Sequence, residues 1–323
     1  MKLTKTYGYL KKDLAMIEEA LEEAIDADHD ILRKASSQLL QAGGKRIRPV
    51  FVLLSAQMGN YNADKVKTVA VSLELIHMAS LVHDDVIDNA DLRRGKATVK
   101  HTYDNRVAMY MGDYILARAL EHITAVDQPA AHKLLSHSMV ELARGEIEQI
   151  KDKYNWDQNL RHYLRRIKRK TALLIATSCK LGAIVSDVPD HHAKQLFKYG
   201  YYVGMSYQII DDILDFTSSE KILGKPAGND LLQGHVTLPL LYAMEDPIFK
   251  EFVAETMSQI ESGNQQNFEQ LLTAFKRTNA IDRAYALSDR YLQKAHATLE
   301  CFPASKTKET LQSIAKFIGN RRS

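Results

Sequence analysis

The chain has 323 residues and a formal net charge of only +3, from 43 basic and 40 acidic side chains, so a dedicated nucleic-acid-binding protein is not expected. Apolar residues make up 45% and charged residues 26%, which is typical of a soluble globular protein with a substantial core. The amino-terminal segment has no apolar stretch of the signal-peptide kind, and the two cysteines belong to no metal-binding cluster. We therefore expect a cytoplasmic protein with reduced thiols and at most peripheral membrane contact.

Helical periodicity runs along the whole chain. From Leu10 to Leu40, apolar residues recur at intervals of three and four, and glutamates occupy the opposite face. The same pattern predicts helical segments over 65–86, 106–123, 130–151, 160–184, 191–216, 236–245, 249–257, 267–277, 280–299 and 306–318. Short breaks fall at 43–44, 59–62, 95, 186–189, 224–234 and 302–303. The sequence therefore predicts one all-α domain spanning residues 1–323, a single large bundle of ten or more helices.

Two aspartate triplets of identical spacing stand at the ends of apolar helical runs. They are Asp84, Asp85 and Asp88 in the first run, and Asp211, Asp212 and Asp215 in the second. In a helix, the first and last members of a triplet share one face. Mg²⁺ prefers one or two carboxylates together with waters and phosphate oxygens. One triplet could equally be a solvated acidic helix end, but the matched pair predicts facing helices that hold Mg²⁺ ions around a diphosphate.

Basic residues form a second candidate site at a Gly-Gly turn. Lys45, Arg46 and Arg48 follow this turn and precede a predicted helix. Guanidinium groups bind phosphate oxygens in pairs and lysine binds them as a point charge, so the turn is a candidate diphosphate clamp. Taken alone, it could also be a solvated basic turn. A denser run from Arg161 to Lys170 could bind anionic lipid or nucleic acid, although such runs are more often solvated helix faces.

Taken together, these motifs resemble those of the trans-isoprenyl diphosphate synthases, over nearly the whole chain. The resemblance rests on residues 43–49 (GGKRIRP), 81–88 (LVHDDVID), 93–95 (RRG), 170–171 (KT) and 207–212 (YQIIDD), in the expected order. It implies an all-α bundle of the isoprenoid synthase type with a central active-site cavity. It also implies repeated condensation of isopentenyl diphosphate onto an allylic diphosphate, with a cluster of up to three Mg²⁺ ions.

The resemblance further implies roles for individual residues. It assigns metal binding to Asp84, Asp85, Asp88, Asp211, Asp212 and, less directly, Asp215. It assigns isopentenyl diphosphate to Lys45, Arg48, His77 and Arg94, and the allylic diphosphate to Arg93, Lys170, Thr171, Gln208 and Lys225. The chemistry is expected to depend on Lys170 and on all of these aspartates except Asp215. On the sequence alone, His77 could equally be a satisfied core histidine.

Product length in this family is set by residues one and two turns before the first triplet. Here these residues are Ile76, Ala79 and Ser80. Short-chain members place an aromatic residue at the fourth or fifth position upstream, which blocks the growing tail. Ala79 and Ser80 are too small to block the growing tail, so a long product is expected. The alternative is that small residues at these positions only permit close helix packing.

Residues 224–239 are similar to the large catalytic subunits (component II) of bacterial heptaprenyl diphosphate synthases. This implies a C35 product for the menaquinone side chain, farnesyl diphosphate as starter and a small non-catalytic partner (component I); the family also permits a homodimer. Many relatives have lysine where His235 stands, so a cation at this position is in question. Arg321 and Arg322 could close over a diphosphate or form a disordered tail.

Three other readings of these motifs are retained as alternatives. The first is a synthase of shorter or longer product within the same family. The second is a class I terpene cyclase, which also uses an aspartate-rich motif and Mg²⁺ but binds one diphosphate. The third is a non-catalytic binder that has kept the fold, against which the intact acids of both triplets argue.

Overall fold

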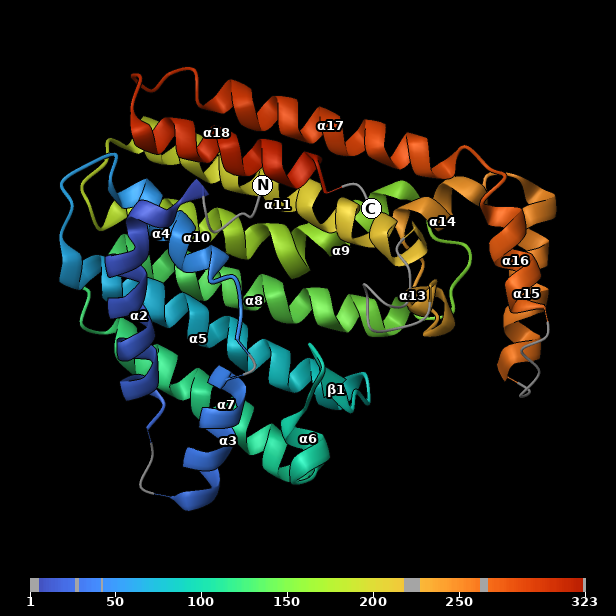
Figure 1. The fold of residues 1–323 in the computed structure, drawn as a ribbon, viewed down its shortest axis with the longest axis horizontal. Helices are drawn as coiled ribbons and strands as arrows, with labels where there is room; N and C mark the ends of the chain where they lie inside the picture. Colours follow the sequence, from blue (N-terminus) through green and yellow to red (C-terminus); the bar gives the residue numbers. More distant parts are fainter. Residues whose placement is uncertain (1–5, 27–28, 42, 218–226, 262–266, 322–323) are drawn as a thin grey trace. The chain divides into compact units, whose positions relative to one another are not determined.

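The computed structural model describes residues 6–26, 29–41, 43–217, 227–261 and 267–321 (Figure 1). Contacts between Cα atoms group the chain into two compact units, which we describe separately. Unit 1 comprises Met1–Ser136, Ile175–Phe197 and Cys301–Leu311, and unit 2 comprises His137–Leu174, Lys198–Glu300 and Gln312–Ser323. The single domain over residues 1–323 stays a prediction, whereas the all-α fold class is confirmed.

Unit 1 contains most of the amino-terminal helices and a small hairpin. Its elements are η1 (Gly8–Leu10), α2 (Lys11–Ala24), α3 (Asp30–Gln41), α4 (Ile47–Ala56), α5 (Ala63–Ile87), β1 (Leu92–Arg93), β2 (Lys96–Ala97), α6 (Val99–Thr102) and α7 (Asn105–Ile123). Strands β1 and β2 are antiparallel, and Leu92 lies opposite Ala97. Within the described ranges, these two-residue strands are the exception to an otherwise helical chain.

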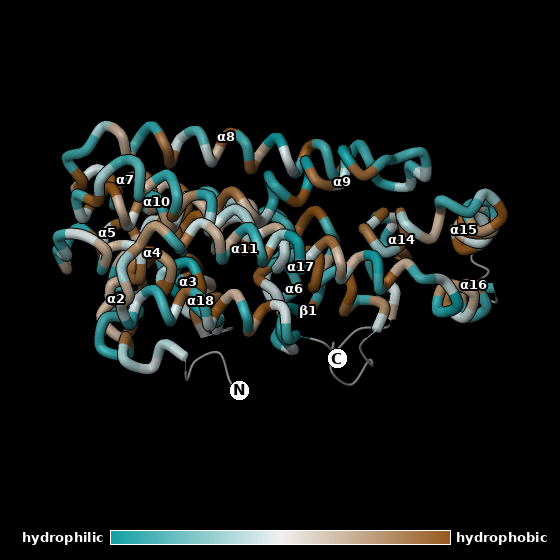
Figure 2. The backbone as a smooth tube through the Cα atoms, turned by 90° about the horizontal axis from the view of Figure 1, so that it is seen from above, coloured by the Kyte–Doolittle hydropathy of each residue, from teal (hydrophilic) through white to brown (hydrophobic). Residues whose placement is uncertain are grey.

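Four helices have residues in both units, and the remaining helices belong to unit 2. The four are α8 (Pro129–Asp152), α10 (Leu173–Ile184), α11 (Asp190–Thr217) and α18 (Lys306–Gly319). Unit 2 also contains α9 (Leu160–Ile167), the π-helical η2 (Lys168–Ala172), α13 (Asn229–Leu232), α14 (Leu238–Ala243), α15 (Pro247–Glu261), α16 (Phe268–Phe275) and α17 (Ala280–Thr298). In Figure 2, hydrophilic and hydrophobic residues alternate along α8, as an amphipathic helix requires.

Helix α5 is the core helix of unit 1. It begins after Asn62, whose side chain accepts a hydrogen bond from the backbone N–H of Lys65 at 3.1 Å and so caps the first turn. It packs against α2, α4 and α7 (Figure 1). By length and composition α5 is apolar enough to cross a membrane, but 67% of its most apolar window is buried within the protein. This burial identifies it as a core helix, because a core helix in a large soluble domain is apolar all round.

The core of unit 2 joins α9, η2, the second half of α11 and helices α13 to α17. Ile209, Ile210 and Ile213 of α11 are fully buried in it, and Phe216 stacks on Phe275 with ring centroids 4.4 Å apart. The second aspartate triplet lies among these apolar residues. The same packing that holds the helices together therefore also buries Asp212 and Asp215, whereas Asp211 is exposed.

Candidate active site

The first aspartate triplet lies at the carboxyl end of α5, in unit 1. The helix ends at Ile87, so Asp84 and Asp85 are in its last turn and Asp88 is its C-cap. Asp85 is buried, and its Oδ1 accepts hydrogen bonds from Nη2 of Arg93 at 2.8 Å and Nε at 2.9 Å. Burial raises the pKa of Asp85, and the bonded guanidinium of Arg93 opposes this rise. The carboxylates of Asp84 and Asp88 are half-buried one turn apart.

The basic turn meets the β1–β2 hairpin within unit 1. Arg94 adopts the left-handed backbone conformation (φ 53°), and its guanidinium donates to the carbonyl oxygen of Gly43. A Cβ atom at Gly44 would lie 3.1 Å from Nη1 of Arg94, so glycine lets the guanidinium approach the backbone closely at this position. The structure therefore brings together two segments predicted to bind isopentenyl diphosphate, the turn of residues 43–48 and Arg94.

His77 lies on α5 beside the same basic group. Burial, followed by the positive charges of Arg48, Arg94, Arg93 and Arg46, lowers the pKa of His77 well below its ordinary value of 6.5. The imidazole is therefore neutral at physiological pH and can offer a hydrogen bond without adding charge. Its position among the arginines agrees with the predicted substrate-binding role, which stays a prediction.

Arg46 has a structural role at the amino end of α4. Its backbone is left-handed (φ 45°), and its side chain is only 11% exposed. Nη2 lies 3.1 Å from Oε2 of Glu18 on α2, and Nη1 lies 3.2 Å from Oε1 of Glu74 on α5. The basic turn is thus fixed to two helices, and the alternative of a solvated basic turn does not fit this residue.

The predicted chain-length residues form part of the α5 core face. Ile76 and Ala79 are each 2% exposed, whereas Ser80 is half-buried and its hydroxyl donates to the carbonyl oxygen of His77 at 2.8 Å. The burial of Ala79 is what close packing alone would also produce. A role for these residues in product length therefore stays a prediction.

The second triplet lies in the last turns of α11, in unit 2. Asp211 is exposed, whereas Asp212 and Asp215 are buried. Oδ2 of Asp212 accepts a hydrogen bond from the hydroxyl of Tyr163 at 2.7 Å, and its Oδ1 accepts one from Nε2 of Gln208 at 2.8 Å. Oδ2 of Asp215 accepts one from the backbone N–H of Asp230 at 3.1 Å.

The electrostatics of Asp212 favour a nearby cation. Burial, and then the negative charge of Asp230, raise the pKa of Asp212 to about 8, although the hydrogen bonds from Tyr163 and Gln208 oppose the rise. A bound divalent cation would favour the ionised carboxylate and reverse this shift. The charge of Asp230 therefore contributes to the environment of the second triplet.

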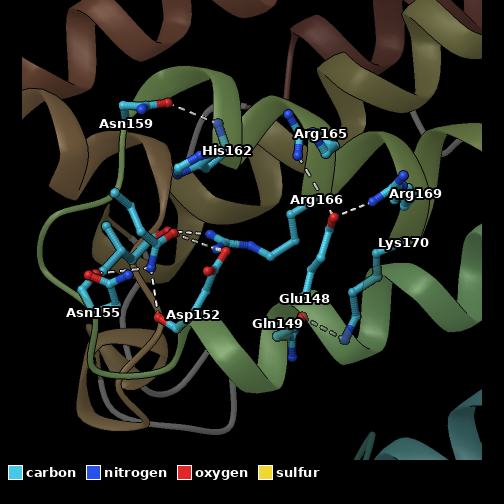
Figure 3. Close-up of polar contacts among 12 residues, drawn as sticks. Glu148, Gln149, Asp152, Asn155, Asn159, His162, Arg165, Arg166, Arg169 and Lys170 are labelled. Atoms are coloured by element: carbon cyan, nitrogen blue, oxygen red, sulfur yellow. Dashed lines mark hydrogen bonds and ion pairs between the residues drawn. The ribbon is translucent and has the colours of Figure 1, made fainter.

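Lys170 and Thr171 lie in η2, the π-helical segment between α9 and α10. Thr171 donates from Oγ1 to Oε1 of Gln208 at 2.7 Å, which links η2 to α11. The Nζ of Lys170 lies 3.0 Å from Oε1 of Gln149 on α8 (Figure 3). It also lies 3.1 Å from Oε2 of Glu146 on the same helix. Short π-helical segments often occur at functional sites. The structure thus joins three of the residues predicted to bind the allylic diphosphate: Lys170, Thr171 and Gln208.

Two other members of the basic run, Arg166 and Arg169, pair with acids of α8 (Figure 3), whereas Arg161, Arg165 and Lys168 are exposed. Arg166 is buried, donates to Oε1 of Gln158 at 2.7 Å and lies 3.5 Å from Oδ2 of Asp152. Arg169 donates to Oε2 of Glu141 at 2.9 Å and also to Glu148. These pairs neutralise Arg166 and Arg169, and a role of the exposed cations in binding nucleic acid or lipid stays a prediction.

Four candidate residues remain: Lys225, His235, Arg321 and Arg322. Nη2 of Arg321 is 3.3 Å from Oδ1 of Asp211, and its guanidinium lies over the ring of Tyr207 at 4.8 Å. Lys225 and Arg322 are outside the described residues. His235 follows α13, and its backbone N–H donates to the carbonyl oxygen of Asp230 at 2.8 Å.

Sequence reasoning missed four residues around the second triplet. Tyr163 and Asp230 act on Asp212, and Glu146 and Gln149 hold Lys170. Tyr163 lies seven residues before Lys170, a spacing that marks the same side of a regular helix, but nothing in the sequence shows that this side meets α11. The other three come from elements whose placement depends on tertiary packing.

The carboxylates fit a magnesium ion. No group of three or more His, Cys, Asp or Glu side chains within the described ranges lies together as a metal site. Mg²⁺ does not require such a group, because it is held by one or two carboxylates, waters and substrate phosphate. The hard oxygen donors at the ends of α5 and α11, and the raised pKa of Asp212, match that chemistry. That the two triplets face each other stays a prediction.

Comparisons with known proteins identify the family. The Polyprenyl synthetase family model matches residues 29–275. The chain is 56% identical to heptaprenyl diphosphate synthase component 2 of Bacillus subtilis, over 100% of this chain and 92% of the relative. The crystal structure of heptaprenyl diphosphate synthase from Staphylococcus aureus superposes with a TM-score of 0.91, at 43% identity, over 97% of this chain and 99% of that one. A polyprenyl synthase from Caulobacter crescentus, complexed with calcium and isoprenyl diphosphate, gives a TM-score of 0.93 at 30% identity, over 100% and 98%. The chain is therefore an enzyme of the polyprenyl synthetase family.

Proposed function

We propose that this chain is the catalytic subunit of a heptaprenyl diphosphate synthase. It condenses isopentenyl diphosphate repeatedly onto an allylic diphosphate, with farnesyl diphosphate as starter and an all-trans C35 diphosphate as product. The printed names of the Bacillus and Staphylococcus proteins support this product. The observation that supports the reaction is the presence of two sets of polar and charged side chains suited to bind a diphosphate, one basic set in unit 1 and one around Lys170 and Asp212 in unit 2. A terpene cyclase would need only one.

The set in unit 1 suits a diphosphate that must stay intact. Lys45, Arg48 and Arg94 offer positive charge, and the guanidinium of Arg94 is already oriented by the Gly43 carbonyl. Neutral His77 adds a hydrogen bond but no acid that could protonate the phosphate bridge. These residues bind isopentenyl diphosphate and hold its double bond in place for attack.

The set in unit 2 suits a diphosphate that must leave. Lys170 is held by Glu146 and Gln149, so its ammonium group is positioned before substrate arrives. As the C1–O bond of the allylic diphosphate breaks, the electron pair goes to the diphosphate, and Lys170 and Thr171 stabilise the added charge. Mg²⁺ held by Asp211 and Asp212 would supply Lewis-acid stabilisation of the same leaving group, and Asp84, Asp85 and Asp88 of unit 1 are proposed as further Mg²⁺ ligands of the reaction. The calcium and isoprenyl diphosphate in the Caulobacter complex support the use of a divalent cation.

A second component completes the proposed enzyme. The relative from Bacillus is named component 2, and a name of this kind implies a component 1. We propose that a small non-catalytic subunit is required for activity, that the pair works in the cytoplasm with at most peripheral membrane contact, and that its product enters menaquinone side-chain synthesis. A homodimer of this chain is compatible with the same proposal.

The test is product formation from defined substrates. The chain, co-expressed with small proteins from neighbouring genes, should incorporate labelled isopentenyl diphosphate onto farnesyl diphosphate and give a C35 product by mass spectrometry. Chelation of divalent cations should stop the reaction, and added Mg²⁺ should restore it. Release of unlabelled hydrocarbon would favour a terpene cyclase. Full activity of the isolated chain would contradict the need for a partner.

Two variants separate metal chemistry from general damage. Asp84→Ala removes a carboxylate of the first triplet and should abolish turnover. Asp91→Asn, on the exposed side of the nearby hairpin, removes a carboxylate that pairs with Lys100 and should leave turnover unchanged. Retained activity of Asp84→Ala would remove this residue from the mechanism.

A further inference from the structure

Tyr163 stands out among the buried polar groups of unit 2 because its hydroxyl contacts a carboxylate of the second triplet. The side chain is 1% exposed, on α9, and its Oη donates to Oδ2 of Asp212 at 2.7 Å. The ring lies in the core formed with Ile209, Ile213 and Val236. A buried tyrosine normally finds a partner for its hydroxyl, but a backbone carbonyl would serve that need equally well. Here the partner is a carboxylate predicted to bind metal.

The two oxygens of Asp212 are held by residues of two different helices. Tyr163 holds Oδ2 from α9, and Gln208 holds Oδ1 from one turn earlier on α11, at 2.8 Å. Gln208 in turn accepts from Thr171 at 2.7 Å. Each oxygen keeps a further lone pair, so the carboxylate can still bind a cation while its rotation is restricted. The chain Tyr163–Asp212–Gln208–Thr171 therefore connects the acid to the segment that carries Lys170.

The position of Tyr163 is itself fixed. The guanidinium carbon of Arg166 lies 5.8 Å from the centroid of its ring. Arg166 is anchored by Gln158 at 2.7 Å and by the carbonyl oxygen of Val236. The hydroxyl is thus presented by a side chain with little freedom to move. This is the arrangement by which groups behind a metal ligand orient that ligand.

We propose that Tyr163 is a positioning residue for the prenyl transfer reaction, which orients Asp212 for a divalent cation bound to the allylic diphosphate. The inference rests on the proposed function, because it assigns a purpose to a residue behind that function's metal site. Tyr163 contacts neither substrate nor metal and acts only through Asp212. Its removal should therefore change metal affinity before it changes the fold.

Metal binding by the full chain provides the test, with Mn²⁺ and inorganic pyrophosphate as probes and electron paramagnetic resonance of free Mn²⁺ as readout. Tyr163→Phe keeps the ring and removes only the hydroxyl, and it should weaken Mn²⁺ binding about 10- to 100-fold. Tyr199→Phe, another fully buried tyrosine of unit 2, is the matched control and should bind as the parent does. Equal Mn²⁺ affinity of Tyr163→Phe and the parent would overturn the inference, as would a parent that binds no Mn²⁺.

A double-mutant cycle separates positioning from a structural role. In a protein that already carries Asp212→Asn, Tyr163→Phe should cause no further loss of Mn²⁺ affinity, because Tyr163 is proposed to act on the metal only through the Asp212 carboxylate. Additive losses would show that Tyr163 acts elsewhere and would overturn the inference. The melting temperatures of the metal-free Tyr163→Phe and Tyr199→Phe proteins should be lowered to a similar extent.

The steady-state constants distinguish this inference from the proposed function. With the partner present, Tyr163→Phe should lower kcat and raise the Mg²⁺ concentration needed for half-maximal rate, while the KM for isopentenyl diphosphate stays unchanged. If the parent makes no polyprenyl product but Mn²⁺ binding still depends on Tyr163, the proposed function fails and the metal-positioning role stands. If the parent is active and Tyr163→Phe matches it, only the inference fails.

Discussion

Lys170 and Glu146 form an ion pair in unit 2, with Nζ and Oε2 3.1 Å apart. The glutamate lies on α8 and the lysine on the π-helical η2, and Gln149 contacts the same ammonium group. A lysine side chain has several rotatable bonds, so two acceptors on one helix greatly reduce the positions that it samples. The cation is therefore placed for a substrate anion by residues that never need to touch that anion.

Replacing Lys170 with alanine should lower kcat/KM for the allylic diphosphate. Hydrogen bonds to charged groups contribute about 1.5–3 kcal/mol, so the expected loss is roughly 10- to 100-fold. Lys168→Ala is the matched control, since Lys168 lies on η2 but is exposed. Steady-state rates with varied farnesyl diphosphate would measure both variants. Similar losses in the two would mean that total charge near η2 matters, and the placement of Lys170 does not.

Ser80→Phe should shorten the product. Ser80 is half-buried on α5, one turn before Asp84, so an aromatic ring can be added there with less overpacking than at Ala79. Adding bulk at a fully packed position costs about 1–3 kcal/mol, which would confuse a test at Ala79. Ser80→Ala removes the hydroxyl without adding bulk and should leave product length unchanged. Mass spectrometry of the dephosphorylated products would size them, and an unchanged C35 product from Ser80→Phe would contradict the chain-length role.

His77 should make the free energy of unfolding depend on pH. Its pKa in the folded protein lies well below 6.5, so the unfolded chain binds a proton that the folded chain does not as the pH falls below 6.5. Stability from this group is therefore present above about pH 6.5 and is lost as the pH falls towards the folded-state value. Urea unfolding between pH 7.5 and 5 would measure it.

Two variants make that measurement specific to His77. His77→Gln should flatten the decline in stability at low pH, because glutamine binds no proton. His162→Gln, at an exposed position on α9, should leave the decline as in the parent. Parallel stability curves for the parent and His77→Gln would show that the imidazole is not held neutral by its surroundings.

Arg46→Met should destabilise unit 1. The change leaves the carboxylate of Glu74, whose side chain is only 5% exposed, without its cation, and breaking a buried pair in this way costs about 3–5 kcal/mol. Chemical unfolding measures the loss. The double variant Arg46→Met/Glu74→Met removes both charges and should recover much of the stability, because no buried charge is left uncompensated. No recovery would mean that the pair with Glu18 dominates.

Much of the fold followed from apolar periodicity. The helix predicted over 65–86 is α5, Ala63–Ile87, because a long apolar run with an asparagine cap has no competing conformation. The helix predicted over 160–184 is confirmed, but the structure also contains a π-helical segment at Lys168–Ala172 that the periodicity did not indicate. The wider turn of a π-helical segment needs no glycine or proline, so no residue type in the sequence marks its position. The helical pattern from Leu10 to Leu40 likewise divides into α2 and α3.

The candidate site was predicted to the extent that residue type reveals chemistry. The residue types and spacing of the aspartate triplets and of the glycine-flanked basic turn by themselves indicate metal and phosphate binding. Tyr163 does not, because its role depends on which side of α9 meets α11, and that is decided by packing between segments about fifty residues apart. Arg46 and Arg48 look alike in the sequence, yet Glu18 and Glu74 engage Arg46. The role of Arg46 depends on these contacts with distant helices, and such contacts cannot be read from a single sequence.

The left-handed backbone at Arg46 and Arg94 bears on how the turn and the hairpin can evolve. For a residue with a side chain, this conformation costs about 1–2 kcal/mol that glycine would avoid. At position 94, a lineage with no need for the guanidinium group would gain stability by changing to glycine, whereas at position 46 glycine would leave the buried carboxylate of Glu74 without its cation. An arginine kept at position 94 in relatives that retain catalysis, and lost in relatives that do not, would therefore indicate selection for its guanidinium group.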